Sequence, residues 1–281
     1  MKKLSTILIA LLLLLSAEGQ ILRYSNYTAP TPPEEIPDFT DEYDIVYAAF
    51  ATKPHADTAD IFNDFVYSLD SAGFWDRTHL LQVYCGAATA TDAVINWITP
   101  GTYNATAMNS PTFTKSRGFD FNGTNQYLNT NFNPYGIVAQ DDATGIVYVR
   151  EDDAQAAGAY FAYDGNYFTL NPRDASNRVQ YRINQSLDEV YTTDAWLGCW
   201  MATRRGATDI QVYRNGSSVD TSVDASSGVA DANIHVSRAA SAYGTRETSL
   251  LMIMDAISTA EAGALNTIIE RMMDRLGIGV Q

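Results

Sequence analysis

The sequence predicts a mainly β protein: a β-sandwich preceded by a small α/β cap and followed by a C-terminal helix. Two observations predict the sandwich. In the stretch 118–134, Asn122-Gly123 separates two segments in which bulky apolar and polar residues alternate. The stretch 209–219 repeats this arrangement around Asn215-Gly216. Asn-Gly is typical of the tight turn between two antiparallel strands, because both residues tolerate positive φ. We therefore expect a β-hairpin at each place.

The first residues are typical of a secretory signal peptide, which we predict over residues 1–19. Lys2 and Lys3 form a positive start, Ile7–Leu15 is an unbroken apolar run, and small residues stand just before Gln20. The apolar run is shorter than the ~20 residues that a membrane-spanning helix needs. Export is favoured over the alternative, an uncleaved membrane anchor.

Residues 20–40 are predicted to be a Pro-rich linker. The segment Thr28–Pro37 contains four prolines, two threonines and two glutamates. Such a composition cannot form a core and favours extended, semi-rigid chain. The linker would hold the folded body away from any surface to which the N-terminus is attached.

Residues 41–101 are predicted to form the small α/β cap. The helix expected at Asp57–Ser71 has one apolar face, with Asp57 or Thr58 as its N-cap and Gly73 as its end. The other elements expected in the cap are strands at Tyr43–Phe50 and Leu80–Tyr84 and a short helix at Thr91–Ile98, which Pro100-Gly101 ends.

Residues 102–281 are predicted to form the sandwich and the C-terminal helix. Besides the two hairpins, strands are expected where apolar and polar residues alternate, at Gly145–Arg150, Tyr160–Phe168, Val179–Ile183, Ala195–Ala202 and Leu250–Ile257. Ser258 and Glu261 have the spacing of a capping box, which predicts that a helix begins there. We expect this helix to run to about Leu276 and to end at Gly277.

The chain beyond residue 43 resembles a module found in tailed-phage and prophage structural proteins. The resemblance is carried by Phe65-Val66, Leu69, Gly73, Trp75, Asn96-Trp97, the run Asn109-Ser110-Pro111-Thr112-Phe113-Thr114, and the stretch from Gly123 to Pro134. The downstream part is similar to a laminin-G-like, concanavalin A-like jelly roll. This resemblance implies a jelly-roll β-sandwich that serves as a virion component or a surface-binding module, and it implies no particular enzymatic activity.

The charge balance argues against nucleic-acid and anionic-membrane partners. The chain has 18 Lys and Arg against 33 Asp and Glu, a formal net charge of -15. Binding to a phosphate backbone requires clustered basic side chains, and the sequence contains no basic patch. Two cysteines remain, Cys85 and Cys199. A disulfide between them and two separately buried thiols are both open, because geometry rather than spacing decides between them.

Catalytic patterns are absent from the sequence. A glycoside hydrolase on this fold needs two carboxylates facing each other across the sugar. The acidic groups Glu151-Asp152-Asp153 and Asp188-Glu189 have turn-like surroundings instead. His55, His79 and His235 are far apart and belong to no metal-binding or protease motif. We therefore predict a protein that is not an enzyme, and a concanavalin-fold glycoside hydrolase remains an alternative.

Binding is better supported by the residue types. Tyrosine stacks on apolar surfaces and hydrogen-bonds through its hydroxyl group, and the chain has 17 Tyr. The candidate ligand-binding residues cluster around one predicted hairpin tip: Tyr160, Tyr163, Asp164, Asn166 and Tyr167. The alternative is that these tyrosines only form cross-strand pairs. No cofactor is predicted, although Asp141-Asp142 and Asp152-Asp153 leave calcium open, since that ion prefers carboxylate oxygens.

Together these observations lead to one functional hypothesis and two alternatives. The hypothesis is a non-enzymatic bacteriophage virion or surface protein that binds a host-surface glycan. Its partners would be other virion proteins or a cell-surface glycan, and a homo-oligomer is open. The alternatives are a secreted bacterial lectin-like protein, located outside the cell, and the glycoside hydrolase.

Overall fold

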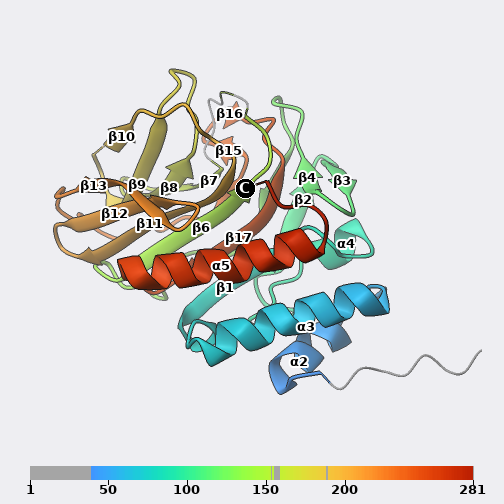
Figure 1. Ribbon diagram of the computed structural model, residues 1–281. Coiled ribbons are helices and arrows are strands. Elements are labelled where there is room, and N and C mark those ends of the chain that lie inside the picture. Colours follow the sequence, from blue (N-terminus) through green and yellow to red (C-terminus); the bar gives the residue numbers. More distant parts are fainter. Residues whose placement is uncertain (1–38, 153, 155–158, 188, 281) are drawn as a thin grey trace, which may run out of the picture. The chain divides into compact units, whose positions relative to one another are not determined.

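A computed structural model describes residues 39–152, 154, 159–187 and 189–280 (Figure 1). The predicted signal peptide and nearly all of the predicted linker lie outside these residues. Two antiparallel sheets form a β-sandwich, and helices cover the outer side of the larger sheet. The predicted fold class, a mainly β protein built as a β-sandwich with a C-terminal helix, is confirmed. Within the described ranges, no helix is both long and apolar enough to cross a lipid bilayer.

The larger sheet has eight strands within the described residues, in the order β13-β12-β11-β6-β17-β4-β3, and β1 also pairs with β17. Its strands are β1 (Thr78–Val83), β3 (Thr112–Thr114), β4 (Gly118–Asp120), β6 (Ala143–Val149), β11 (Gly198–Gly206), β12 (Asp209–Arg214), β13 (Ser217–Ser222) and β17 (Thr248–Met254).

The smaller sheet has seven strands within the described residues, in the order β10-β9-β8-β7-β14-β5-β2. Its strands are β2 (Thr106–Met108), β5 (Tyr127–Asn129), β7 (Tyr160–Tyr163), β8 (Tyr167–Asn171), β9 (Val179–Gln185), β10 (Glu189–Tyr191) and β14 (His235–Val236). A short hairpin, β15 (Arg238–Ala239) and β16 (Ala242–Tyr243), follows β14.

The described helices are α2 (Asp41–Ala49), α3 (Ala56–Ser71), α4 (Ala90–Ala93), α5 (Thr259–Arg275) and the 3-10 helix η1 (Trp75–Arg77). The helix α5 confirms the predicted C-terminal helix. The side chain of Ser258 accepts a hydrogen bond from the backbone N–H of Glu261, and the Glu261 side chain accepts one from the backbone N–H of Ser258. The predicted capping box is therefore present, and Gly277 follows the helix with φ of 72°.

The central strands of the larger sheet are buried on both faces. On β6, Val147 and Val149 belong to the core between the two sheets, whereas Ile146 and Tyr148 belong to a second core beneath the helices. All seven residues of β6 and of β17 are buried. A strand with apolar side chains on both faces must be covered on both sides. The smaller sheet covers one face, and α3 and α5 cover the other.

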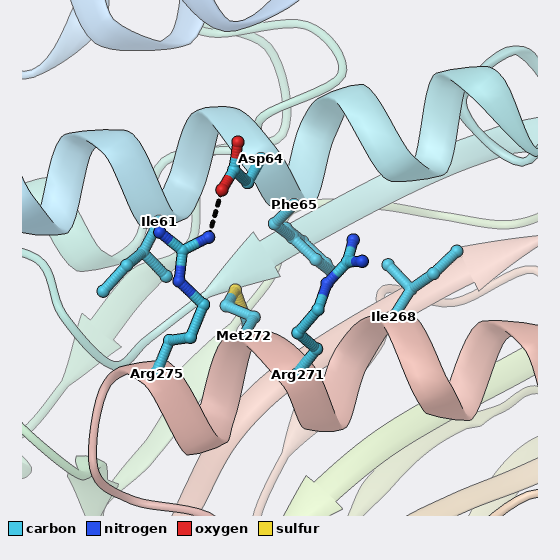
Figure 2. A pocket seen from close by; sticks show the side chains of 7 residues that line it. All are labelled: Ile61, Asp64, Phe65, Ile268, Arg271, Met272 and Arg275. Atoms are coloured by element: carbon cyan, nitrogen blue, oxygen red, sulfur yellow. Dashed lines mark hydrogen bonds and ion pairs between the residues drawn. The ribbon is translucent and has the colours of Figure 1, made fainter.

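The two covering helices, α3 and α5, pack side by side (Figure 1). Figure 2 shows Phe65 of α3 and Met272 of α5 among the residues that line a pocket between the two helices. At the outer rim of this contact, Arg275 forms an ion pair with Asp64, and the Arg271 guanidinium donates a hydrogen bond to the Ser68 hydroxyl. Apolar side chains and polar contacts at the rim therefore both join the two helices.

The segment Tyr43–Phe50, expected to be a strand, is instead the helix α2. The hydroxyl of Thr40 accepts a hydrogen bond from the backbone N–H of Tyr43, which caps the helix. Tyr43 and Val46, three residues apart, are its buried residues. The strand prediction was wrong because the spacing of the aromatic residues fits both the two-residue period of a strand and the period of a helix. The N-cap formed by Thr40 favours the helix.

The Asn122-Gly123 turn does not connect a hairpin. The strand before it, β4, pairs with β3 and β17, and the strand after it, β5, pairs with β2 and β14 in the other sheet. Both edges of β4 are thus occupied, so β5 cannot pair with it. The side chain of Asn122 accepts hydrogen bonds from the backbone N–H groups of Thr124 and Asn125, which stabilises an arch between the sheets. The hairpin prediction at this position was wrong.

The second Asn-Gly hairpin is confirmed. Strands β12 and β13 pair in antiparallel register on either side of Asn215-Gly216. These two residues have φ of 50° and 75°, as a turn with two left-handed central residues requires. The strand predicted at Tyr160–Phe168 is two strands, β7 and β8, which form a hairpin with its tip at 164–166.

The region 41–101 differs from the expected cap in three ways. The strand β1 pairs with β17 and so belongs to the larger sheet. The helix α3 begins with His55 as its N-cap rather than Asp57 or Thr58. The helix expected at Thr91–Ile98 is the single turn α4, because the backbone N–H of Trp97 donates to the carbonyl of Leu81 on β1. By its contacts, the chain from Phe39 onward is one unit.

Cys85 and Cys199 are separate thiols, and both are buried in the core beneath the helices. The Cys85 thiol lies 3.8 Å from the sulfur of Met273. Burial raises the pKa of Cys85 to about 12 and also raises the pKa of Cys199. Of the two readings that the sequence left open, the structure shows the pair of buried thiols and not the disulfide.

The closest backbone approach at a described glycine predicts a severe mutation. Gly118 has φ of 112°, and a Cβ there would lie 2.2 Å from the carbonyl oxygen of Thr248. We expect Gly118→Ala to lower the free energy of unfolding by about 3 kcal/mol or more, because it adds backbone strain and a clash. Urea denaturation followed by tryptophan fluorescence measures this change.

Gly136→Ala is the matched control for this measurement. Gly136 also has positive φ, 75°, but a Cβ there meets nothing within 4 Å. Its substitution costs only the left-handed backbone strain, about 1 kcal/mol. Equal losses in the two variants would show that the contact with Thr248 does not matter.

Candidate functional site

Alternate residues of the smaller sheet point to opposite sides, and the side opposite the core is partly exposed to solvent. Leu128, Val236 and Tyr160 are neighbours across β5, β14 and β7, and they belong to the core between the sheets. The residues one step away point outward. We call this outward side the outer face of the smaller sheet; its members used below are Tyr127, Asn129, Phe161, Tyr163, Tyr167, Arg182 and His235.

Two of the predicted ligand-binding residues form a stack on this face. The rings of Tyr163 and Tyr167 pair across β7 and β8, with centroids 4.2 Å apart and planes 23° apart. The guanidinium of Arg182 lies 3.8 Å from the centre of the Tyr167 ring. Tyr163 is 46% exposed, whereas Arg182 is 9% exposed. The result is an ordered stack of two rings and a guanidinium with Tyr163 outermost.

The tip of the same hairpin is held by its own polar side chains. A carboxylate oxygen of Asp164 accepts a hydrogen bond from the backbone N–H of Asn166, and Gly165 between them has φ of 124°. The Asn166 side-chain oxygen accepts a hydrogen bond from the hydroxyl of Ser227, 2.5 Å away. Asp164 and Asn166 therefore stabilise the turn, and the contact with Ser227 joins the tip to the loop before β14.

Tyr160 does not belong to this surface. Its side chain is fully buried and packs against Phe168 in the core between the sheets. Gly145 on β6 makes room for it, since a Cβ there would lie 2.1 Å from the Tyr160 hydroxyl. The prediction of a ligand-binding role for Tyr160 was wrong. Tyr160 and Tyr163 are three residues apart on one strand, so their side chains point to opposite faces of the sheet.

A second group of aromatic and basic side chains lies beside this stack. The guanidinium of Arg238 is 4.6 Å from the ring centre of Tyr127 and 5.9 Å from that of Tyr243. The imidazole of His235 meets Tyr127 edge to face, with ring centres 5.1 Å apart. The Nε of Arg238 donates a hydrogen bond to the carbonyl of Ala240. The arginine head is thereby fixed between rings and backbone.

A hollow of about 130 Å³ connects the two groups. It is lined by Phe161, Ala162, Tyr163, Ala232, Asn233, His235, Arg238 and Ala240. Burial and the nearby Arg238 charge lower the pKa of His235 to about 4. His235 is therefore neutral near pH 7, so that its ring can both donate and accept a hydrogen bond. The Arg238 guanidinium is the charged group of the hollow.

The carboxylates considered in the sequence lie elsewhere. Glu189, on the edge strand β10, accepts a hydrogen bond from the Ser222 hydroxyl, and burial followed by the nearby Asp224 raises its pKa. Asp142 accepts a hydrogen bond from the backbone N–H of Ala256, and Asp152 pairs with Arg173. Asp153 and Asp188 lie outside the described residues. Within the described part of the chain, no group of three or more metal-ligating side chains is close enough to hold an ion.

The sequence did not reveal the part of the site that contains Arg238, His235 and Tyr127. Two of these residues stand more than one hundred positions after the third, and only the sheet order brings them together. The spacing of Phe161 and Tyr163, two residues apart on one strand, was the available signal. Successive side chains of a strand point to opposite faces. Once Tyr160 is known to point into the core, this spacing therefore predicts that Phe161 and Tyr163 both point outward.

Comparisons with solved structures find proteins that share the fold. Trypanosoma rangeli sialidase in complex with sialic acid matches with a TM-score of 0.50 at 10% identity, over 74% of this chain and 38% of that one. The binding domain of botulinum neurotoxin DC in complex with SialylT matches with a TM-score of 0.51 at 12% identity, over 69% and 52% of the two chains. This chain thus matches about two fifths to one half of their length. No protein-family model and no curated protein matches it.

The lowered pKa of His235 predicts that the protein loses stability as the pH falls. The unfolded chain binds a proton to this residue near pH 6.5, but the folded chain does so only near pH 4. Between these values protonation favours the unfolded state. We expect the free energy of unfolding to fall between pH 7 and pH 5, with His235 contributing about 1 kcal/mol after allowance for its partial exposure.

Urea denaturation of the wild type and of His235→Gln at both pH values isolates this contribution. The variant lacks the titrating group, so its loss of stability should be smaller by that amount. A parallel pH dependence in the two proteins would contradict the assignment.

Proposed function

We propose that the protein is a carbohydrate-binding module whose ligand lies on the outer face of the smaller sheet. The observation that carries this proposal is the stack of Tyr163, Tyr167 and Arg182. An exposed aromatic ring offers an apolar face to the C–H side of a sugar ring, and its hydroxyl reaches polar neighbours. The hydrogen bond to Tyr167 raises the pKa of Tyr163.

The rigidity of the stack favours binding. Tyr163 is held by Tyr167, and Tyr167 by Arg182, before any ligand arrives. Ordering a flexible side chain at an interface costs ~0.5–1.5 kcal/mol, and a side chain that is already ordered avoids most of this loss. The hollow beside the stack adds amide, imidazole and guanidinium groups that can hydrogen-bond hydroxyls.

The two solved structures support the ligand class only in general terms. One is a sialidase in complex with sialic acid, and the other is a toxin binding domain in complex with SialylT. The chain shares a fold with parts of both proteins. Sandwiches of this kind host unrelated functions, so the argument rests on the residues of the outer face.

The proposed setting is a bacteriophage virion surface, where the module would bind a host-cell glycan. The resemblance of Asn109 to Thr114 and of Gly123 to Pro134 to a tailed-phage structural module supports this setting. Other virion proteins would then be partners, and a homo-oligomer is compatible with it. A secreted bacterial lectin is the second candidate, favoured by the signal-like pattern of residues 1–19.

We further propose that the protein binds sugars without hydrolysing them. None of the residues lining the hollow is acidic. Glu189 and its acidic neighbours lie at the β10 edge of the smaller sheet, and the hollow lies at β7 and β14. Most glycosidases need two carboxylates, one on either side of the bound sugar, whereas sialidases use a tyrosine nucleophile. This arrangement favours a lectin-like role over a glycoside hydrolase of the two-carboxylate kind.

The stack predicts the effect of one substitution on glycan binding. Tyr163→Ala removes the outermost ring, and we expect at least a tenfold weaker signal for whichever glycans the wild type retains on a glycan array. Tyr67→Ala is the matched control, because Tyr67 is 58% exposed but stands on α3 in the helical layer. Equal binding by wild type and Tyr163→Ala would overturn the proposed site.

The virion setting is tested by the N-terminus of the mature protein. Mass spectrometry of purified particles and of culture supernatant identifies where the chain begins in each. We expect the protein in particles. Its presence only in the supernatant, beginning at Gln20, would favour the secreted lectin and contradict the virion proposal.

A further inference from the structure

We propose that the hollow beside β14 is a carboxylate-binding subsite, and that Arg238 makes the module prefer acidic sugars over neutral ones. This inference rests on the proposed function and narrows its ligand class. Three features of the hollow support it: its charge, the fixed position of Arg238 and its size.

The charge of the hollow is opposite to that of the protein. The chain carries a formal net charge of -15, yet the hollow contains a guanidinium and no acidic side chain. None of the salt bridges found among the described residues involves Arg238. An arginine surrounded by tyrosine rings instead of carboxylates keeps its ability to bind an anion. His235 is neutral near pH 7 and adds no competing charge.

The overall negative charge does not prevent such binding. Charges on a protein surface are screened over a distance of about 8 Å at physiological ionic strength. A carboxylate in the hollow would be much closer than this to Arg238. The nearby guanidinium therefore outweighs the distant acidic residues, although it does so less at high salt.

The head of Arg238 is held in a fixed position. Its Nε donates to the carbonyl of Ala240, and its planar group lies near the rings of Tyr127 and Tyr243. The contact through Nε leaves the two terminal nitrogens to make the parallel pair of hydrogen bonds that arginine forms with a carboxylate. A lysine has no such planar pair of donors.

The size of the hollow fits one end of a sugar rather than a whole oligosaccharide. Its volume of about 130 Å³ corresponds to about four water molecules. Sites that enclose a drug-sized ligand are larger, about 300–1,000 Å³. A carboxylate and its ring carbon would enter beside Arg238. The sugar ring would then lie against Phe161 and Tyr163, which also line the hollow.

The test compares acidic sugars with their methyl esters, in which the carboxylate is neutral and carries a methyl group. The full chain is titrated calorimetrically with the methyl glycosides of N-acetylneuraminic acid and of glucuronic acid, and with the methyl esters of both. We expect at least one acid to bind about tenfold or more tightly than its ester, since a hydrogen bond to a charged group is stronger than one to a neutral group. This preference should decrease as the salt concentration rises.

Variants assign the preference to Arg238. Arg238→Gln should abolish the tenfold difference between acid and ester, and Arg238→Lys should retain only part of it. Arg205→Gln is the matched control, because Arg205 is a partly exposed arginine at the end of β11 that pairs with Asp209. Thermal unfolding confirms that each variant is folded, and the acid–ester comparison in the wild type needs no variant.

Two outcomes would overturn the inference in different ways. If acids and esters bind equally, or if Arg238→Gln keeps the preference, the carboxylate subsite is wrong while the carbohydrate-binding function stands. If the wild type binds none of these sugars and no glycan on the array, the proposed function fails and the inference fails with it.

Discussion

The structure depends on the burial of its central strands on both faces. The strands β6, β11 and β17 alternate between two sets of apolar side chains, one for each face of the larger sheet. On β17, for example, Leu251 and Ile253 face the smaller sheet, whereas Leu250 and Met252 face the helices. Leaving either set in water would cost roughly 1.5–3 kcal/mol for each large side chain. The smaller sheet and the pair α3 and α5 are therefore both obligatory.

This constraint also explains where a binding surface can form. The central strands of the larger sheet have no face left for a ligand, since the two cores take both. The smaller sheet needs only one apolar face, and its other face can carry side chains selected for contact with something else. Phe161, Tyr163, Tyr167 and His235 stand on that other face. The larger sheet lies between the smaller sheet and the helices, whereas the smaller sheet is covered on one face only. The candidate site can therefore form on the smaller sheet.

The sequence predicted the elements whose signals are local. The capping box of Ser258 and Glu261 and the hairpin at Asn215-Gly216 were both correct, because each is stabilised by residues within a few positions of one another. The Asn122-Gly123 turn has the same local signal, yet it joins two different sheets. Only the pairing of β4 on both edges excludes a hairpin, and this depends on Thr248, far along the chain.

Only the part of the candidate site with a local sequence pattern could be predicted. The hairpin tip around Tyr163 has a clear local pattern, although strand parity removes Tyr160 from the surface. The second half of the site required the order of β5, β14 and β7 in the sheet. No local pattern connects Tyr127 with Arg238, so their contact is a product of topology. The positions of outward side chains are set by their inward neighbours on the same strands, Leu128, Tyr160 and Val236, which are fully buried. Packing of the core therefore holds the rings and guanidinium groups of the outer face in place, so the proposed ligand would meet a surface that was ordered when the protein folded.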